Sequence, residues 1–167
     1  WCPFGLQIEK AYLHVYNLLS DKSDMGIYFV DYILHEKAEV DENLRQYCIQ
    51  EEEKEKYPAY LSCFTASGDY QQCLGEAGIS QAALENCTFE TDRDYNITSF
   101  YNNKNTWLGG TSPQFNLHKD LNEQYGVTGS PTIVINDEVV VVNPRSPENF
   151  KNIVCQAFEN PPEECSQ

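Results

Sequence analysis

Apolar residues recur at every third or fourth position in several stretches of the chain, which is the spacing of amphipathic helices. The first helix is predicted to begin after Cys2, because Pro3 suits the first helical position and Cys2 then becomes the N-cap residue. Shorter helices follow in the middle of the chain, one of them capped by Ser80. Another helix begins at Asn116, and the last begins at Ser146.

Two other stretches have the pattern of strands. Ile27–Ile33 is apolar on both alternating faces, as in a strand buried between helices. Thr132–Ile135 is rich in β-branched residues, Asn136-Asp137 supplies turn residues, and Glu138–Val142 returns, so these residues predict a hairpin. A helix followed by a strand, with another strand expected before the helix, is a βαβ unit. The pattern therefore predicts an α/β fold.

The residue pattern changes in the middle of the chain. Residues 38–107 are predicted to be a helical insertion held by cysteines, between the core segments 1–37 and 108–160. Residues 161–167 follow as a tail, because two consecutive prolines prevent the last helix from continuing.

Seven cysteines in 167 residues are many for a chain kept in a reducing compartment. None forms a Cys-x-x-Cys pair and no histidine lies at ligand spacing, so the sequence predicts no metal site. Glycosylation sequons begin at Asn86 and Asn96. These features predict a secreted or luminal glycoprotein.

The odd number of cysteines leaves one thiol unpaired, and Cys2 is the natural candidate. The other six allow fifteen connectivities. Our preferred set takes two pairs for their short separation and the third by elimination: Cys155 with Cys165, Cys63 with Cys73, and Cys48 with Cys87.

The net charge of −15 argues against a nucleic acid or an anionic lipid surface as partner, because phosphate binding needs a basic face. No stretch approaches the ~20 consecutive apolar residues of a membrane-spanning helix. No glycine-rich phosphate loop is present, and we expect no cofactor. His14, His35 and His118 are predicted to be solvated residues.

Two short motifs together resemble a known family. Cys2-Pro3-Phe4-Gly5 precedes a helix, and Ser130-Pro131-Thr132 opens a late strand. In this the chain resembles the thioredoxin superfamily, particularly the disulfide-oxidase group with a helical insertion. The cysteine-rich middle and the last helix also resemble the gamma-interferon-inducible lysosomal thiol reductases and the luminal thioredoxin-like part of plant vacuolar sorting receptors. The chain departs from the pattern in two ways: Gly5 stands where the second active-site cysteine belongs, and only Trp1 precedes Cys2 where a strand belongs.

The resemblance implies a thioredoxin-like α/β fold with a cysteine-bridged insertion, and Cys2 as the reactive thiol. It implies a cis Pro131 facing Cys2 and a Ser130 backbone that pairs with a substrate strand. The substrates would be protein or peptide thiols and disulfides. Because Gly5 cannot resolve a mixed disulfide, the chain would act as a monothiol oxidoreductase or isomerase.

A second interpretation is a non-catalytic extracellular binding or assembly domain that keeps the scaffold. Without a first strand, Ile27–Ile33 and Thr132–Ile135 would leave backbone groups unpaired. We expect an upstream segment, or a strand from another chain in a homo-oligomer or assembly, to pair with them.

Overall fold

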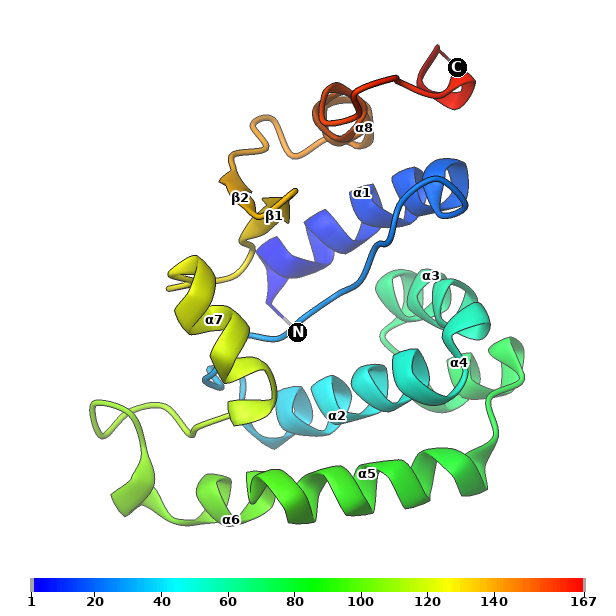
Figure 1. The fold of residues 1–167 in the computed structure, drawn as a ribbon. Helices are drawn as coiled ribbons and strands as arrows, with labels where there is room; N and C mark the ends of the chain where they lie inside the picture. The colour runs from blue at the N-terminus through cyan, green and yellow to red at the C-terminus, as the bar shows by residue number, and fades with distance from the viewer. Residues whose placement is uncertain (1, 167) are drawn as a thin grey trace. The chain divides into compact units, whose positions relative to one another are not determined.

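The structure, a computed structural model, describes residues 2–166, so Trp1 and Gln167 lie outside the described residues. The described chain is a mixed α/β protein in which helices predominate over one two-stranded sheet (Figure 1). It divides into a helical unit, residues 27–128, and a hairpin unit, residues 2–26 with 129–166. No helix between residues 2 and 166 is both long enough and apolar enough to cross a membrane.

The helical unit contains most of the helices. They are α2 (Glu36–Glu52), α3 (Tyr57–Ser67), α4 (Tyr70–Ala77), α5 (Gln81–Tyr95), α6 (Ile97–Asn102) and α7 (Lys119–Tyr125), with 3-10 turns η1 (Lys54–Lys56), η2 (Lys104–Thr106) and η3 (Asn116–His118). Helix α5 packs along α2, and α3 packs against α4 (Figure 1).

Local signals in the sequence explain several boundaries of these helices. The Ser80 hydroxyl accepts a hydrogen bond from the N–H of Ala83 and so caps α5, as predicted. Gly126 ends α7 in the left-handed conformation, with φ of 60°, which a residue without Cβ adopts at little cost. The core of this unit comes from several elements and the loops between them: Phe29, Ile33, Val40, Leu44, Ile97, Phe115 and Leu117.

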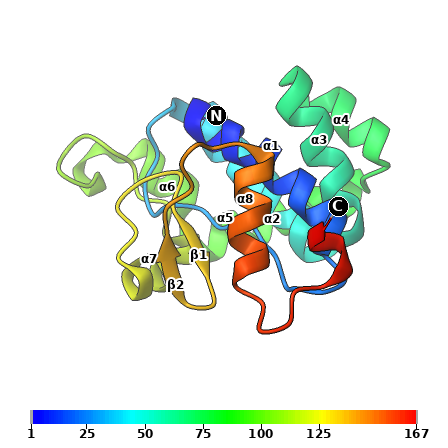
Figure 2. The ribbon, with the colours of Figure 1, turned by 90° about the horizontal axis from the view of Figure 1, so that it is seen from above.

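The hairpin unit consists of α1 (Pro3–Leu19), β1 (Ile133–Ile135), β2 (Glu138–Val140), α8 (Pro147–Gln156) and the 3-10 turn η4 (Glu163–Ser166). Asn136 and Asp137 form the hairpin turn, both at positive φ, which these two residue types tolerate. The Asn136 side chain donates a hydrogen bond to the carbonyl of Ala157, which ties the turn to the end of α8. The hairpin and α8 lie side by side (Figure 2). Helix α8 packs against α1.

The three disulfides are the pairs preferred from the sequence, and they are typical of a protein folded in an oxidising compartment. Two lie in the helical unit and one joins α8 to η4: Cys48–Cys87, Cys63–Cys73 and Cys155–Cys165. Cys2 is the free cysteine.

The strand predicted at Ile27–Ile33 is wrong. The segment is extended but forms only an isolated bridge between Tyr32 and Gln114, because no strand lies alongside it within residues 2–166. Side chains, instead of a neighbouring strand, form hydrogen bonds with the backbone of this segment. The Gln50 amide bonds both backbone groups of Ile27, and His118 accepts from the N–H of Phe29.

The two units do not follow the predicted boundaries. Residues 27–37 and 108–128 belong with the helical unit, where we had assigned them to the same core as α1 and the hairpin. Side-chain hydrogen bonds explain this grouping, because they join the extended segment 27–33 to α2 and to the region of α7.

Candidate functional site

The free thiol lies at the start of the longest helix of the hairpin unit. Cys2 is half-buried and is the N-cap of α1, with extended backbone angles, and its carbonyl accepts the first helical hydrogen bond from Leu6 at 2.9 Å. Pro3 has no N–H, and the N–H groups of Phe4 and Gly5 have no hydrogen-bond partner in the described chain. They belong to the first-turn donors for which a helix supplies no acceptor of its own.

Gly5 allows the Ser130 loop to come close to this helix. A Cβ atom added to Gly5 would lie 3.3 Å from the Ser130 Oγ and 3.5 Å from the Cβ of Cys2. The first distance is tight for a carbon next to an oxygen, so a side chain at this position would push against the hydroxyl. Cys2, Gly5 and Ser130 therefore form one cluster, although Ser130 lies more than 120 positions after the other two in the sequence.

Ser130 and Pro131 lie in the loop that enters β1. The Ser130 side chain is exposed, Pro131 is half-buried, and the peptide bond between them is cis. The resemblance implies a substrate-binding role for these residues, and the structure brings Ser130 to the first turn of α1.

The arrangement can perform nucleophilic chemistry of one kind. A thiolate at Cys2 can attack a disulfide, but the position one helical turn away is occupied by Gly5, so no neighbouring thiol can release the product. Among residues 2–166 no group of three or more potential metal ligands comes together.

The glycosylation candidates lie in the helical unit, away from this cluster in the sequence. Asn86 is exposed on α5, inside a sequon whose middle residue, Cys87, is buried in a disulfide. Asn96 is exposed at the junction of α5 and α6, in the left-handed conformation.

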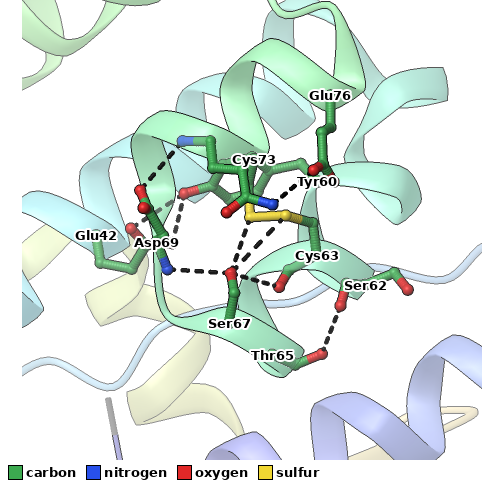
Figure 3. Close-up of a disulfide and its surroundings, with 10 residues drawn as sticks. Glu42, Tyr60, Ser62, Cys63, Thr65, Ser67, Asp69, Cys73 and Glu76 are labelled. Carbon is green, nitrogen blue, oxygen red and sulfur yellow. Dashed lines mark hydrogen bonds between the residues drawn. A yellow bond between two sulfur atoms is a disulfide. The ribbon is translucent and has the colours of Figure 1, made fainter.

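The disulfide between α3 and α4 has a hydroxyl beside it (Figure 3). The Ser67 Oγ lies 3.4 Å from the sulfur of Cys73, donates to the carbonyl of Cys63 at 3.0 Å, and accepts from the N–H of Asp69 at 3.1 Å. These bonds order the turn between the two helices that this disulfide joins.

His118 is a residue whose setting the sequence analysis missed, since we expected it to be solvated. Its ring lies among Tyr28, Phe29 and Tyr47, with ring centroids 5.1 to 5.7 Å away, and its Nδ1 accepts from the N–H of Phe29 at 3.0 Å. Burial lowers the pKa of His118 from 6.5 to about 4. His14 and His35 are exposed. The sequence shows the aromatic residues near Tyr28, but it does not indicate that aromatic rings pack against His118.

A second polar group that the sequence did not indicate is buried inside the helical unit. Glu42, only 1% exposed, accepts hydrogen bonds from Arg45, from Gln46 at 3.0 Å and from the Tyr60 hydroxyl at 2.9 Å. Burial raises the pKa of Glu42, and these partners oppose that rise. The Arg45 guanidinium also stacks on Tyr70, 3.8 Å from its ring centroid. This network is satisfied internally, so we assign it a structural role.

No protein-family model, curated protein or solved structure matches the chain. The resemblance to the thioredoxin superfamily therefore depends on the sequence pattern alone: the motifs at Cys2–Gly5 and Ser130–Thr132, the cysteine-rich middle and the last helix.

Proposed function

We propose that this chain is a secreted or luminal thioredoxin-like domain that exchanges disulfides through one thiol, Cys2. The supporting observation is the cluster of Cys2, Gly5 and Ser130 at the first turn of α1. The free thiol at the N-cap of α1, where the N–H groups of Phe4 and Gly5 have no partner among the described residues, supports such an exchange.

The exchange proceeds in two balanced steps. The Cys2 thiolate attacks one sulfur of a substrate disulfide, forms a mixed disulfide and expels the other sulfur as a thiolate. A second thiol of the same substrate then attacks the substrate sulfur and releases Cys2 as a thiolate. The substrate leaves with a rearranged disulfide, so the cycle needs no external oxidant or reductant. This is an isomerase reaction.

The test uses a small protein with scrambled disulfides as substrate. We expect the wild-type chain to accelerate recovery of the native pairing, and the Cys2→Ser variant to be inactive while keeping its three disulfides. Intact-mass spectrometry of an acid-quenched reaction should show one substrate molecule joined at Cys2. Equal recovery rates with wild type and Cys2→Ser would contradict the proposal.

A second candidate function, binding or assembly without catalysis, has its own observation. In the extended segment of the helical unit, the backbone N–H and C=O groups of Tyr28, Val30 and Tyr32 have no hydrogen-bond partner in the part of the chain that is described. The odd-numbered residues between them are bonded by side chains and by the 113–115 loop. An extended strand of another chain could pair with these free groups.

The test of this second function is the oligomeric state. If copies pair through this edge, the chain should associate as its concentration rises, and the amides of Tyr28, Val30 and Tyr32 should become protected from hydrogen exchange. Val30→Pro removes an N–H that has no partner among residues 2–166, so it should abolish association, whereas Val30→Ala should not. A chain that stays monomeric with unprotected amides would contradict pairing between copies.

A further inference from the structure

A pocket of about 420 Å³ lies in the hairpin unit, lined by Gln7 of α1 and by residues 141–145. Large apolar side chains are exposed in the same unit near its lining. Phe4, which lies one helical turn before Gln7, is 59% exposed, and Val141 is 82% exposed. Exposed apolar side chains gathered beside a concave surface are typical of a binding site.

Arg145 gives this pocket a charge. Its guanidinium lies over the ring of Phe4, with 5.3 Å between Cζ and the ring centroid. Arg145 forms no ion pair with any carboxylate among residues 2–166, in a chain that carries 26 acidic and 11 basic residues. A planar guanidinium held over an aromatic ring, with its N–H groups unpaired, is suited to bind a carboxylate.

We propose that this pocket binds the peptide segment that carries the substrate disulfide, an inference that rests on the proposed function. An acidic side chain of the substrate pairs with Arg145, and an apolar side chain next to it packs against Phe4 and Val141. Gln7, the lining residue on α1, is five residues from Cys2, so the pocket and the thiol lie toward the same end of α1. The preferred substrates are therefore disulfide-bearing peptides with an acidic residue beside an apolar one.

The pocket is tested first without any exchange chemistry. The protein is the Cys2→Ser variant, and the probes are two labelled peptides with serine in place of cysteine, one containing Val-Glu and the other Val-Gln. We expect the Val-Glu peptide to bind about five-fold more tightly at low salt, with the preference falling as salt rises. Arg145→Gln should remove the preference, and Lys10→Gln, which removes an exposed cation from α1, should keep it.

The outcomes separate the pocket from the thiol. Equal binding of the two peptides by the Cys2→Ser protein at low salt would overturn the pocket proposal, even where wild type exchanges disulfides. Because the two peptides are compared on a protein that keeps Arg145, this test remains valid even if Arg145→Gln does not fold. A Glu preference that Arg145→Gln removes, in a chain without isomerase activity, would keep the pocket as a peptide-binding site and remove the proposed catalysis.

Discussion

A Cβ atom on residue 5 would lie 3.5 Å from the Cβ of Cys2. That separation falls at the short end of the ~3.5–4.5 Å range found between the Cβ atoms of disulfide-bonded cysteines. The backbone of α1 therefore has the geometry for a disulfide between positions 2 and 5, and the glycine side chain is what prevents it.

This relationship predicts the behaviour of Gly5→Cys. The variant should form a disulfide with Cys2 on mild oxidation, and free-thiol titration should then find no reactive thiol, whereas mild reduction that leaves the other three disulfides intact should expose two. Ser130→Ala should favour the bond, because the added Cβ lies 3.3 Å from the Ser130 hydroxyl. Phe4→Cys is the control, since its exposed side chain projects from another side of the helix. Two free thiols in oxidised Gly5→Cys would contradict the geometry.

The burial of His118 predicts a loss of stability in acid. Because the pKa of His118 falls from 6.5 to about 4 on folding, its stabilising effect is complete above pH 6.5 and is lost as the pH falls toward 4. The protonated ring cannot accept from the N–H of Phe29. We expect a contribution of about 2 kcal/mol, reduced from the full shift because the ring is partly exposed.

The measurement is urea unfolding at a series of pH values from neutral to acid. His118→Phe should lower the stability at neutral pH, since the Phe29 N–H loses its acceptor, and should weaken the decline toward acid. His14→Gln changes an exposed histidine and should leave the decline as in wild type. An unchanged decline in His118→Phe would assign the acid sensitivity to other groups.

The buried carboxylate of Glu42 predicts a cost for removing one of its donors. Tyr60→Phe deletes the hydroxyl that bonds both oxygens of Glu42 and should lower the free energy of unfolding by about 1.5–3 kcal/mol. Tyr95→Phe, at a more exposed tyrosine on α5, should change it by less than about 0.5 kcal/mol. Equal effects of the two substitutions in denaturant unfolding would show that the Glu42 bond contributes nothing.

The disulfides are predicted to contribute different amounts to the free energy of unfolding, according to the length of chain that each one closes. Cys48–Cys87 closes a separation of 39 residues and Cys155–Cys165 one of 10, which correspond to about 4 and about 3 kcal/mol from chain entropy. Replacing both cysteines of each pair by serine should therefore lower the unfolding free energy more for Cys48–Cys87. A larger loss for the short pair would show that native contacts outweigh loop closure.

Much of the secondary structure could be predicted because its causes lie within a few residues. Pro3 after Cys2 starts α1, the Ser80 and Ser146 hydroxyls cap α5 and α8, and Asn136-Asp137 forms the turn of the hairpin. The disulfide pairs followed from short separations and from the count of cysteines, because few alternatives remained once Cys2 was left free.

The sequence alone determined where most of the helices lie, where the hairpin turns and which cysteine is left unpaired, because helix caps, turn residues and an odd number of thiols act locally or by counting. Only the tertiary structure decided that Ile27–Ile33 is held by side chains instead of a ladder, and that His118 lies among aromatic rings. It also decided that Ser130 meets Gly5. Whether a segment pairs as a strand, and whether a polar group is buried, depends on residues far away in the chain. The residue pattern of the segment itself does not indicate which residues those are.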